Sequence, residues 1–222
     1  MPALLPPILG RSLGALALLA LLLVAPGQAR AAELKLLAFG DSLVHGYGLA
    51  DGNTFPEQLE AALQAAGHDV KVINGGNSGD TTAAGRARLD WSLAERPDAV
   101  LVELGANDSL RGLDPDQTYA NLDAILTRLG DEGLPVLLAG MLAPRNLGTR
   151  YTEAFDSVYP RLAEKHDVAL YPFFLDGVAL DPSLNQADGI HPNAAGVGVI
   201  VERITPAVVA LIEQAGRKDS SE

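Results

Sequence analysis

The stretch Leu34-Lys-Leu-Leu-Ala-Phe-Gly-Asp-Ser-Leu43 decides how this sequence folds. Its first six residues form a short, mostly apolar run, and the next four form a turn that carries two polar side chains. A run that is apolar almost throughout, rather than at alternate positions, is typical of a parallel strand covered on both faces. Four similar runs follow along the chain, at residues 70–74, 99–104, 135–141 and 168–171.

Segments with helical spacing of apolar residues separate these runs. The capping box Thr54-Phe-Pro-Glu57 predicts the start of a helix that ends near Gly67. Asn193 is expected to cap the last helix. The other expected helices cover residues 81–95, 115–130, 150–166 and 194–215.

Strands that alternate with helices in this way indicate an α/β fold. We expect one three-layer α/β/α domain over residues 32–216, with a doubly wound, five-stranded, mostly parallel sheet of the flavodoxin-like kind. Ligands in such folds bind beyond the carboxyl ends of the strands. Functional residues should therefore follow the strands directly.

The composition excludes several classes of protein. The 222 residues include 28 Asp and Glu against 16 Lys and Arg, which gives a net charge of −12. Such an acidic chain is not expected to bind nucleic acid through a broad basic surface. It contains no cysteine, so disulfides, cysteine nucleophiles and thiolate metal sites are excluded.

Residues 1–31 have a different character from the rest of the chain. Arg11 precedes an apolar run at residues 13–25, and Ala29-Arg-Ala31 follows it. As a helix this run would span only ~20 Å, less than the ~30 Å of a bilayer core. The pattern predicts a cleaved signal peptide, and hence a periplasmic or secreted bacterial protein without stable membrane insertion after cleavage. The alternative is an uncleaved membrane anchor. Residues 217–222 are expected to form a polar tail.

Four polar or glycine-rich segments follow the predicted strands. Because the carboxyl ends of parallel strands meet at one edge of a sheet, these segments should lie close together. They are Gly40-Asp-Ser-Leu43, Asn74-Gly-Gly-Asn-Ser-Gly-Asp80, Gly105-Ala-Asn-Asp108 and Asp188-Gly-Ile-His191.

In their order and spacing these segments resemble the four diagnostic blocks of the SGNH (GDSL) hydrolases. The resemblance extends over about residues 34–215. Three further details are similar to the branch of secreted bacterial arylesterases, acyl-CoA thioesterases and lysophospholipases. They are Tyr47-Gly-Leu49, Ser109-Leu-Arg-Gly112 and the pattern from Arg150 to Phe155.

Acyl transfer needs a nucleophile, a base and a group that orients the base. Ser42 lies where a strand ends, so its hydroxyl can project from the sheet edge; Ser78 is a competing serine. Asp188 and His191 are three residues apart, which on a single helical turn puts both side chains on one side. Ser42, His191 and Asp188 then fit a catalytic triad. An α/β-hydrolase would need a G-x-S-x-G elbow, which the sequence lacks.

The resemblance also implies an oxyanion hole formed by the backbone N–H groups of Ser42 and Gly79 and by the side-chain amide of Asn107. Asp41 and Asp108 are interpreted as hydrogen-bond acceptors that brace the loops. The glycines of residues 75–80 predict a segment that moves when substrate binds.

Recognition of an acyl chain would need apolar walls. The candidates, from their position after the strands, are Leu110, Leu142, Pro144 and Tyr151, for which ordinary loop packing is the alternative. His45 is interpreted as a rim side chain. Neither a metal nor a cofactor is expected, since no histidines have metal-ligand spacing.

The sequence thus predicts a serine hydrolase that cleaves small-molecule carboxylic esters and acyl thioesters through an acyl-enzyme, most simply as a monomer. One alternative is a carbohydrate O-acetylesterase of the same family. Another, from a different class, is a non-catalytic periplasmic binding protein. The natural acyl donor is not evident from the sequence.

Overall fold

The computed structural model describes Met1, Ala3 and residues 33–219. The predicted signal peptide, apart from those two isolated residues, lies outside the described residues. Residues 220–222 of the predicted polar tail also lie outside them.

The centre of the domain is a sheet of five strands in the order β2-β1-β3-β4-β5. All four neighbouring pairs are parallel, so the predicted doubly wound α/β fold is confirmed. Strands β1, β3 and β4 are the inner strands, and their apolar side chains are buried, except for the partly buried Leu34, as their continuous apolar runs predict. The strands are β1 (Leu34–Gly40), β2 (Val70–Gly76), β3 (Ala99–Glu103), β4 (Val136–Ala139) and β5 (Ala169–Tyr171).

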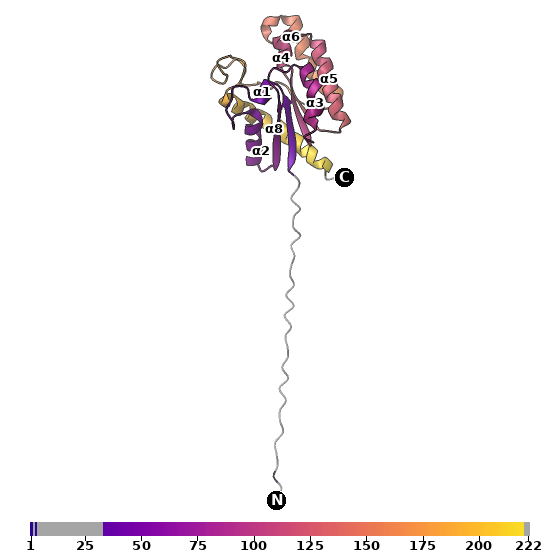
Figure 1. Cartoon of the computed structure of the whole chain (residues 1–222), viewed down its shortest axis with the longest axis vertical. Coiled ribbons are helices and arrows are strands. Elements are labelled where there is room, and N and C mark those ends of the chain that lie inside the picture. The colour runs from indigo at the N-terminus through magenta and orange to yellow at the C-terminus, as the bar shows by residue number, and fades with distance from the viewer. Residues whose placement is uncertain (2, 4–32, 220–222) are drawn as a thin grey trace. The chain divides into compact units, whose positions relative to one another are not determined.

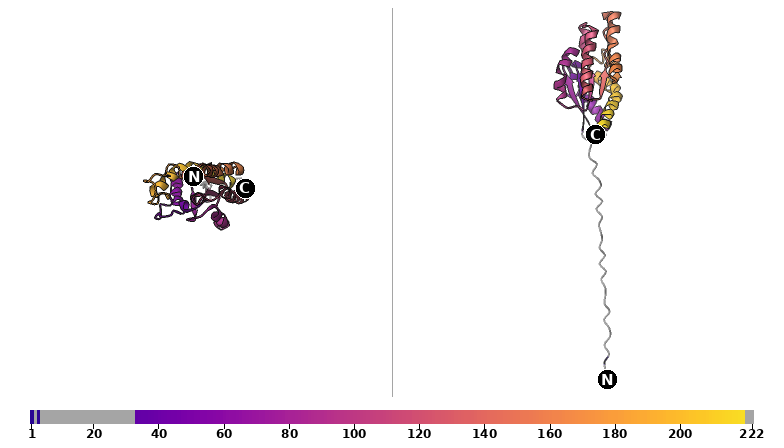
Figure 2. Two further views of the ribbon diagram at one scale, coloured as in Figure 1. Left: turned by 90° about the horizontal axis from the view of Figure 1, so that it is seen from above. Right: turned by 90° about the vertical axis from the view of Figure 1, so that its right-hand side faces the viewer.

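Helices pack on the sheet in two groups. Helix α2 packs against α8, while α3 packs against α5 and α5 against α7 (Figure 1). The yellow helix α8 runs along one side of the domain in the right-hand view of Figure 2. The helices are α1 (Ser42–His45), α2 (Phe55–Ala65), α3 (Thr82–Leu93), α4 (Ala106–Leu110), α5 (Pro115–Asp131), α6 (Thr149–Asp156), α7 (Val158–His166) and α8 (Ala194–Asp219), with a 3₁₀ turn η1 at Arg145–Leu147.

The predicted caps form at the helix starts. The Glu57 carboxylate accepts hydrogen bonds from the backbone N–H (3.1 Å) and the hydroxyl (2.6 Å) of Thr54, which begins α2. The Asn193 side chain accepts from the backbone N–H of Gly196 (3.0 Å) at the start of α8. These local contacts therefore follow directly from the sequence.

Two helix boundaries differ from the prediction. The helix expected over residues 150–166 is divided at Ser157 into α6 and α7. Pro160 has no N–H to donate to the carbonyl of Asp156, and its ring crowds that carbonyl, so the two helices meet there. The last helix continues to Asp219 instead of ending at residue 215. A glycine such as Gly216 costs a helix only about 1 kcal/mol, and good helix formers follow it.

Helix α8 is long and apolar enough to cross a membrane, by length and composition alone. In the folded domain it contacts α2 and four of the five strands. Its residues Val197, Ile200, Ile204 and Val208 are buried in the core. The apolar character of α8 is therefore accounted for by packing on the sheet.

Strand β3 passes into α4 through Gly105, where the backbone has φ +119°. A Cβ atom at this position would lie 2.2 Å from the hydroxyl oxygen of Tyr159. The absence of a side chain therefore lets α7 approach the end of β3 closely.

The close approach at Gly105 predicts the effect of adding one methyl group. Gly105→Ala should lower the free energy of unfolding by about 3 kcal/mol or more, because it combines backbone strain with a clash against Tyr159. Gly112→Ala is the matched control, since Gly112 also has positive φ but has no atom within 4 Å of an added Cβ. The control should cost about 1–2 kcal/mol. Urea unfolding of both variants measures the difference, and equal losses would contradict the packing argument.

Candidate active site

Ser42 lies at the point where β1 passes into α1. The strand ends at Gly40, Asp41 is the N-cap residue, and Ser42 is the first residue of the helix. The Asp41 carboxylate accepts a hydrogen bond from the backbone N–H of Leu43 (3.0 Å). This cap fixes the direction of the turn, so Ser42 is 9% exposed and its hydroxyl faces the edge of the sheet where His191 lies.

A chain of two hydrogen bonds joins Ser42, His191 and Asp188. The Nε2 atom of His191 is 2.9 Å from the Ser42 Oγ. The Nδ1 atom of the same ring is 2.7 Å from an oxygen of Asp188. The structure thus brings together three side chains that are up to 149 residues apart, in the geometry by which a carboxylate orients an imidazole toward a hydroxyl.

Asp188 and His191 meet through a turn, and the predicted helical turn is not formed. One oxygen of Asp188 accepts from the backbone N–H groups of Ile190 (3.0 Å) and His191 (3.1 Å). Gly189 has φ +75°, which favours glycine. The hydrogen bonds from the His191 ring and the Ile190 N–H lower the pKa of Asp188 to about 2. Asp188 is therefore ionised at neutral pH.

Tyr47 contacts the imidazole on its face and was not predicted as a site residue. The ring centroids of Tyr47 and His191 are 4.6 Å apart, with a tilt of 37°. The Gln186 side chain donates to the backbone carbonyl of Tyr47 (2.7 Å), which holds the tyrosine loop against the histidine loop. Tyr47 is half-exposed and so forms part of the rim of the site.

Asn107 lies in α4, after β3, and points its amide toward the turn that carries Ser42. Its Nδ2 atom donates a hydrogen bond to the Asp41 carboxylate (3.1 Å). A carboxylate only accepts, so this bond determines which end of the amide faces Asp41. The amide has two N–H groups, and the second remains able to donate to a ligand.

Gly79 lies in the segment after β2, with φ +86°. Its carbonyl accepts from the Arg111 guanidinium (2.8 Å), which fixes the orientation of the Gly79–Asp80 peptide group. Within the same segment, the backbone N–H of Asn77 donates to the Gly40 carbonyl (3.0 Å), and the Asn77 amide donates to Asp80 (2.6 Å). This bonding argues against the movement expected of residues 75–80.

Asp108 braces the loops as predicted. Its carboxylate accepts from the backbone N–H (2.8 Å) and hydroxyl (2.5 Å) of Thr82 and from the hydroxyl of Thr118 (3.3 Å). It therefore joins the start of α3 to α5. Asp41 also acts as an acceptor, but it belongs to a buried pair with Glu103 that sequence reasoning missed. The available signal was a single acid within the apolar run of β3.

The residues predicted to bind an acyl chain are exposed to different extents. Leu110 ends α4, Tyr151 lies in α6, and Leu142 and Pro144 lie in the loop after β4. Leu110 is 50% exposed and Leu142 is 39% exposed, while Pro144 is partly buried. Tyr151 is also partly buried, and its hydroxyl donates to the carbonyl of Leu113 (2.8 Å), so it ties α6 to the loop after α4. Leu110 and Leu142 thus present apolar surface to solvent.

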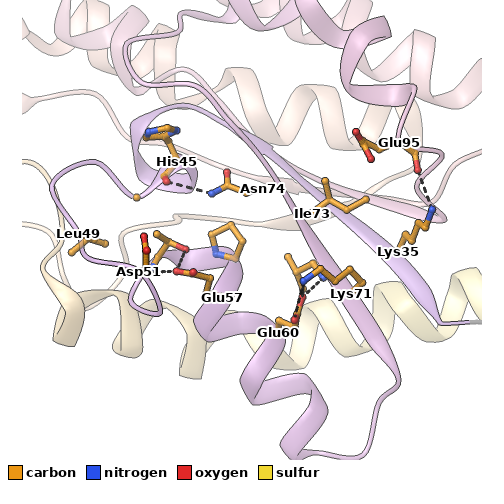
Figure 3. A pocket seen from close by; sticks show the side chains of 14 residues that line it. Lys35, His45, Leu49, Asp51, Glu57, Glu60, Lys71, Ile73, Asn74 and Glu95 are labelled. Carbon is orange, nitrogen blue, oxygen red and sulfur yellow. Dashed lines mark hydrogen bonds and ion pairs between the residues drawn. The ribbon is translucent and has the colours of Figure 1, made fainter.

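A separate groove of about 780 Å³ follows edge strand β2 (Figure 3). The three residues of the Ser42 chain do not line it. In this groove Lys71 bridges to Glu60 (3.0 Å), and the Lys35 ammonium donates to the backbone carbonyl of Glu95 (3.4 Å). His45 lies at one end of the groove, exposed, and its carbonyl accepts from Asn74 (3.3 Å). His45 therefore lines this groove, whereas the imidazole bonded to Ser42 is that of His191.

No group of three or more His, Asp or Glu side chains in the described part of the chain could hold a metal ion. A hydroxyl bonded to an oriented imidazole, next to amide donors, can support nucleophilic attack on a carbonyl group.

Comparison with known proteins agrees with this arrangement. Residues 38–199 match the model of the GDSL-like lipase/acylhydrolase family. An arylesterase of Vibrio mimicus is 42% identical over 80% of this chain and 90% of its own length. Esterase TesA of Pseudomonas aeruginosa is 42% identical over 82% of this chain and 92% of its own length.

Solved structures give the same result. The crystal structure of TesA has a TM-score of 0.76 at 42% identity, covering 80% of this chain and 99% of that one. AlinE4, an SGNH-hydrolase family esterase, has a TM-score of 0.69 at 48% identity, covering 80% of this chain and 96% of that one. The fold and the comparisons thus define a serine ester or thioester hydrolase whose fold belongs to the α/β class. The chain belongs to the GDSL-like lipase/acylhydrolase family.

Proposed function

We propose that this chain, a serine hydrolase of carboxylic esters and acyl thioesters, works through an acyl-enzyme on Ser42, with His191 as the base and Asp188 as the group that orients it. The observation that carries this proposal is the continuous hydrogen-bond chain from Ser42 Oγ through both ring nitrogens of His191 to Asp188. The ionised Asp188 stabilises the imidazolium that forms when His191 takes the serine proton.

In the first half of the reaction, Ser42 Oγ attacks the carbonyl carbon while its proton passes to His191 Nε2. The carbonyl oxygen becomes an oxyanion, bound by the backbone N–H groups of Ser42 and Gly79 and the second N–H of Asn107. The C–O or C–S bond then breaks, and the leaving alcohol or thiol takes the proton from His191.

In the second half, water attacks the acyl-Ser42 ester while His191 accepts a proton from it. The tetrahedral intermediate collapses, the proton returns to Ser42 Oγ, and the carboxylic acid leaves. The reaction therefore needs no cofactor and no metal ion, because proton transfer and charge stabilisation come from side chains and backbone.

We infer a broad substrate range of small acyl esters and thioesters. Relatives named arylesterase, esterase, and thioesterase 1/protease 1/lysophospholipase L1 support this inference. The exposed apolar side chains of Leu110 and Leu142, with Pro144 and Tyr151, are proposed as walls for the acyl chain. A carbohydrate O-acetylesterase would instead favour acetyl groups, and a binding protein would have no turnover.

We propose that residues 1–31 are a secretory signal and that the enzyme works in the periplasm or outside the cell, as a monomer without stable membrane insertion. The support is the order of Arg11, an apolar run and a small-residue site in the sequence.

Removal of the proposed nucleophile should abolish turnover. Ser42→Ala is expected to hydrolyse a p-nitrophenyl ester at no more than a few percent of the wild-type kcat, because the alanine cannot form the acyl-enzyme. Ser78→Ala is the matched control, since Ser78 is an exposed serine in a neighbouring loop, and it should keep near wild-type activity. Substantial turnover by Ser42→Ala would refute the mechanism.

Removal of the proposed side-chain oxyanion donor should act on the transition state. Asn107→Ala is expected to lower kcat by roughly 10²–10³-fold with little change in KM. Asn146→Ala, at an exposed asparagine in η1, provides the control. Steady-state kinetics of both variants measure the effect, and a change confined to KM would exclude the assigned role of Asn107.

A series of acyl chain lengths tests the proposed acyl walls and the competing functions together. The wild type should prefer butanoyl or octanoyl esters to acetyl esters, and Leu110→Ala should lower the octanoyl-to-acetyl ratio of kcat/KM roughly 3- to 10-fold. Trp91→Ala is the control. Trp91 is exposed and lies near the end of α3 that is farther from the carboxyl ends of the strands. Turnover restricted to acetylated sugars would favour the O-acetylesterase, and no ester turnover at all would favour the binding protein.

A further inference from the structure

A buried pair of acids lies directly behind Ser42. Glu103 is the last residue of β3 and Asp41 precedes Ser42, and both are fully buried. The parallel register places Gly40 opposite Glu103. The backbone N–H of Asp41 donates to Glu103 Oε2 (3.3 Å), and the two side-chain carboxyl groups are hydrogen-bonded to each other.

The close contact depends on Gly40. A Cβ atom at this position would lie 2.7 Å from Glu103 Oε2. The other oxygen, Oε1, is the one buried side-chain nitrogen or oxygen atom in the described part of the chain that has no hydrogen-bond partner. A carboxylate oxygen without a donor is costly to bury, whereas a protonated carboxyl group can itself donate.

Two buried carboxyl groups in contact share protons, because a second negative charge would be both desolvated and repelled. Burial raises the pKa of Asp41 to about 6, and burial together with the Asp41 charge raises the pKa of Glu103 well above its usual range. Asp41 accepts N–H bonds from Leu43 and Asn107, which favour its charged form. Glu103 accepts only the N–H of Asp41, so the shared proton belongs on Glu103.

We propose that Glu103 is a positioning residue that stays protonated in the working enzyme and donates its proton to Asp41, so that Asp41 remains the anion that orients Asn107. This proposal rests on the assigned roles of Ser42 and Asn107. Rotation of the Asn107 amide by 180° would present its oxygen to the developing oxyanion and repel it. An anionic Asp41 selects the N–H end, because a carboxylate only accepts hydrogen bonds.

The other charged or titratable groups around the pair already have partners. From α7, the buried Tyr159 donates to the Leu104 carbonyl (2.9 Å). From α3, Arg88 bonds to Asp80 (2.6 Å) and to the Gly40 carbonyl (2.8 Å). Asp108 of α4 accepts from threonines, and His191 bonds to Ser42 and Asp188. Glu103 is therefore left as the proton donor to Asp41.

Two uncharged substitutions of Glu103 distinguish hydrogen-bond donation to Asp41 from simple filling of space. Glu103→Gln keeps an N–H donor toward Asp41 and should retain kcat within about 3-fold of wild type. Glu103→Leu has a similar size but no donor, and should lower kcat roughly 10- to 100-fold with little change in KM, because Asn107 loses its orientation. Glu164→Gln, at an exposed acid on α7, is the control and should match wild type.

Equal activity of the Gln and Leu variants would overturn the proposal, and so would equal loss in both while circular dichroism shows that they are folded. A pH profile adds a second readout. In the Leu variant Asp41 loses the donated proton, so its pKa should rise, and the acid limb of kcat should move to higher pH than in the Gln variant. An unmoved acid limb contradicts the proposal.

Infrared spectroscopy tests the proton on the wild-type enzyme itself. At pH 8 ordinary carboxyl groups are ionised, so a carbonyl band of a protonated carboxylic acid should remain in wild type and disappear in Glu103→Gln. A wild-type spectrum without that band overturns the proposal. The band does not depend on turnover, so a failure of the Ser42 mechanism would leave this result intact and the two failures are distinguishable.

Discussion

The position of Ser42 depends on the close approach of β1 to β3 at Gly40. A side chain there would meet Val44 at 2.4 Å and Glu103 at 2.7 Å, so only glycine lets the strand turn at Asp41 into α1. The Gly40 carbonyl accepts from Arg88 of α3 and from the backbone N–H of Asn77. One peptide group thus joins β1, the loop after β2 and α3. Ser42, Gly79 and Asn107 lie in the loops and short helices that these contacts hold.

Much of the fold could be predicted because its signals are local. The apolar runs of β1, β3 and β4 are buried strands, and Thr54 and Asn193 cap the helices that follow them. The break between α6 and α7 was missed because Pro160 is compatible with two interpretations. Within one long helix it forms a kink, whereas in the first turn of a new helix it is a favourable residue. Packing chooses between these outcomes, and packing cannot be read from that segment alone.

The site was predictable only where residue spacing carries the information. Asp188 and His191 are bonded as expected, although the backbone between them is a turn with Gly189 at positive φ. Tyr47 and Glu103 escaped notice because their partners are distant in sequence. Tyr47 contacts His191 although the two are 144 positions apart in the sequence, and the hydrogen bond from Gln186 to the Tyr47 carbonyl holds them together. Glu103 is recognisable only once β1 and β3 are paired.

The balance of charge around His191 gives the buried pair its significance. Asp188 is ionised and bonded to one ring nitrogen, while the negative charge of Asp41 also interacts with the ring. A third carboxylate at Glu103 would add repulsion to the oxyanion proposed to bind at Asn107, whose amide also contacts Asp41. One neutral acid in the pair keeps the orienting effect of Asp41 without that added repulsion. The imidazolium and the amide donors then act beside two carboxylates, Asp188 and Asp41, instead of three. Less carboxylate charge near the oxyanion favours the transition state.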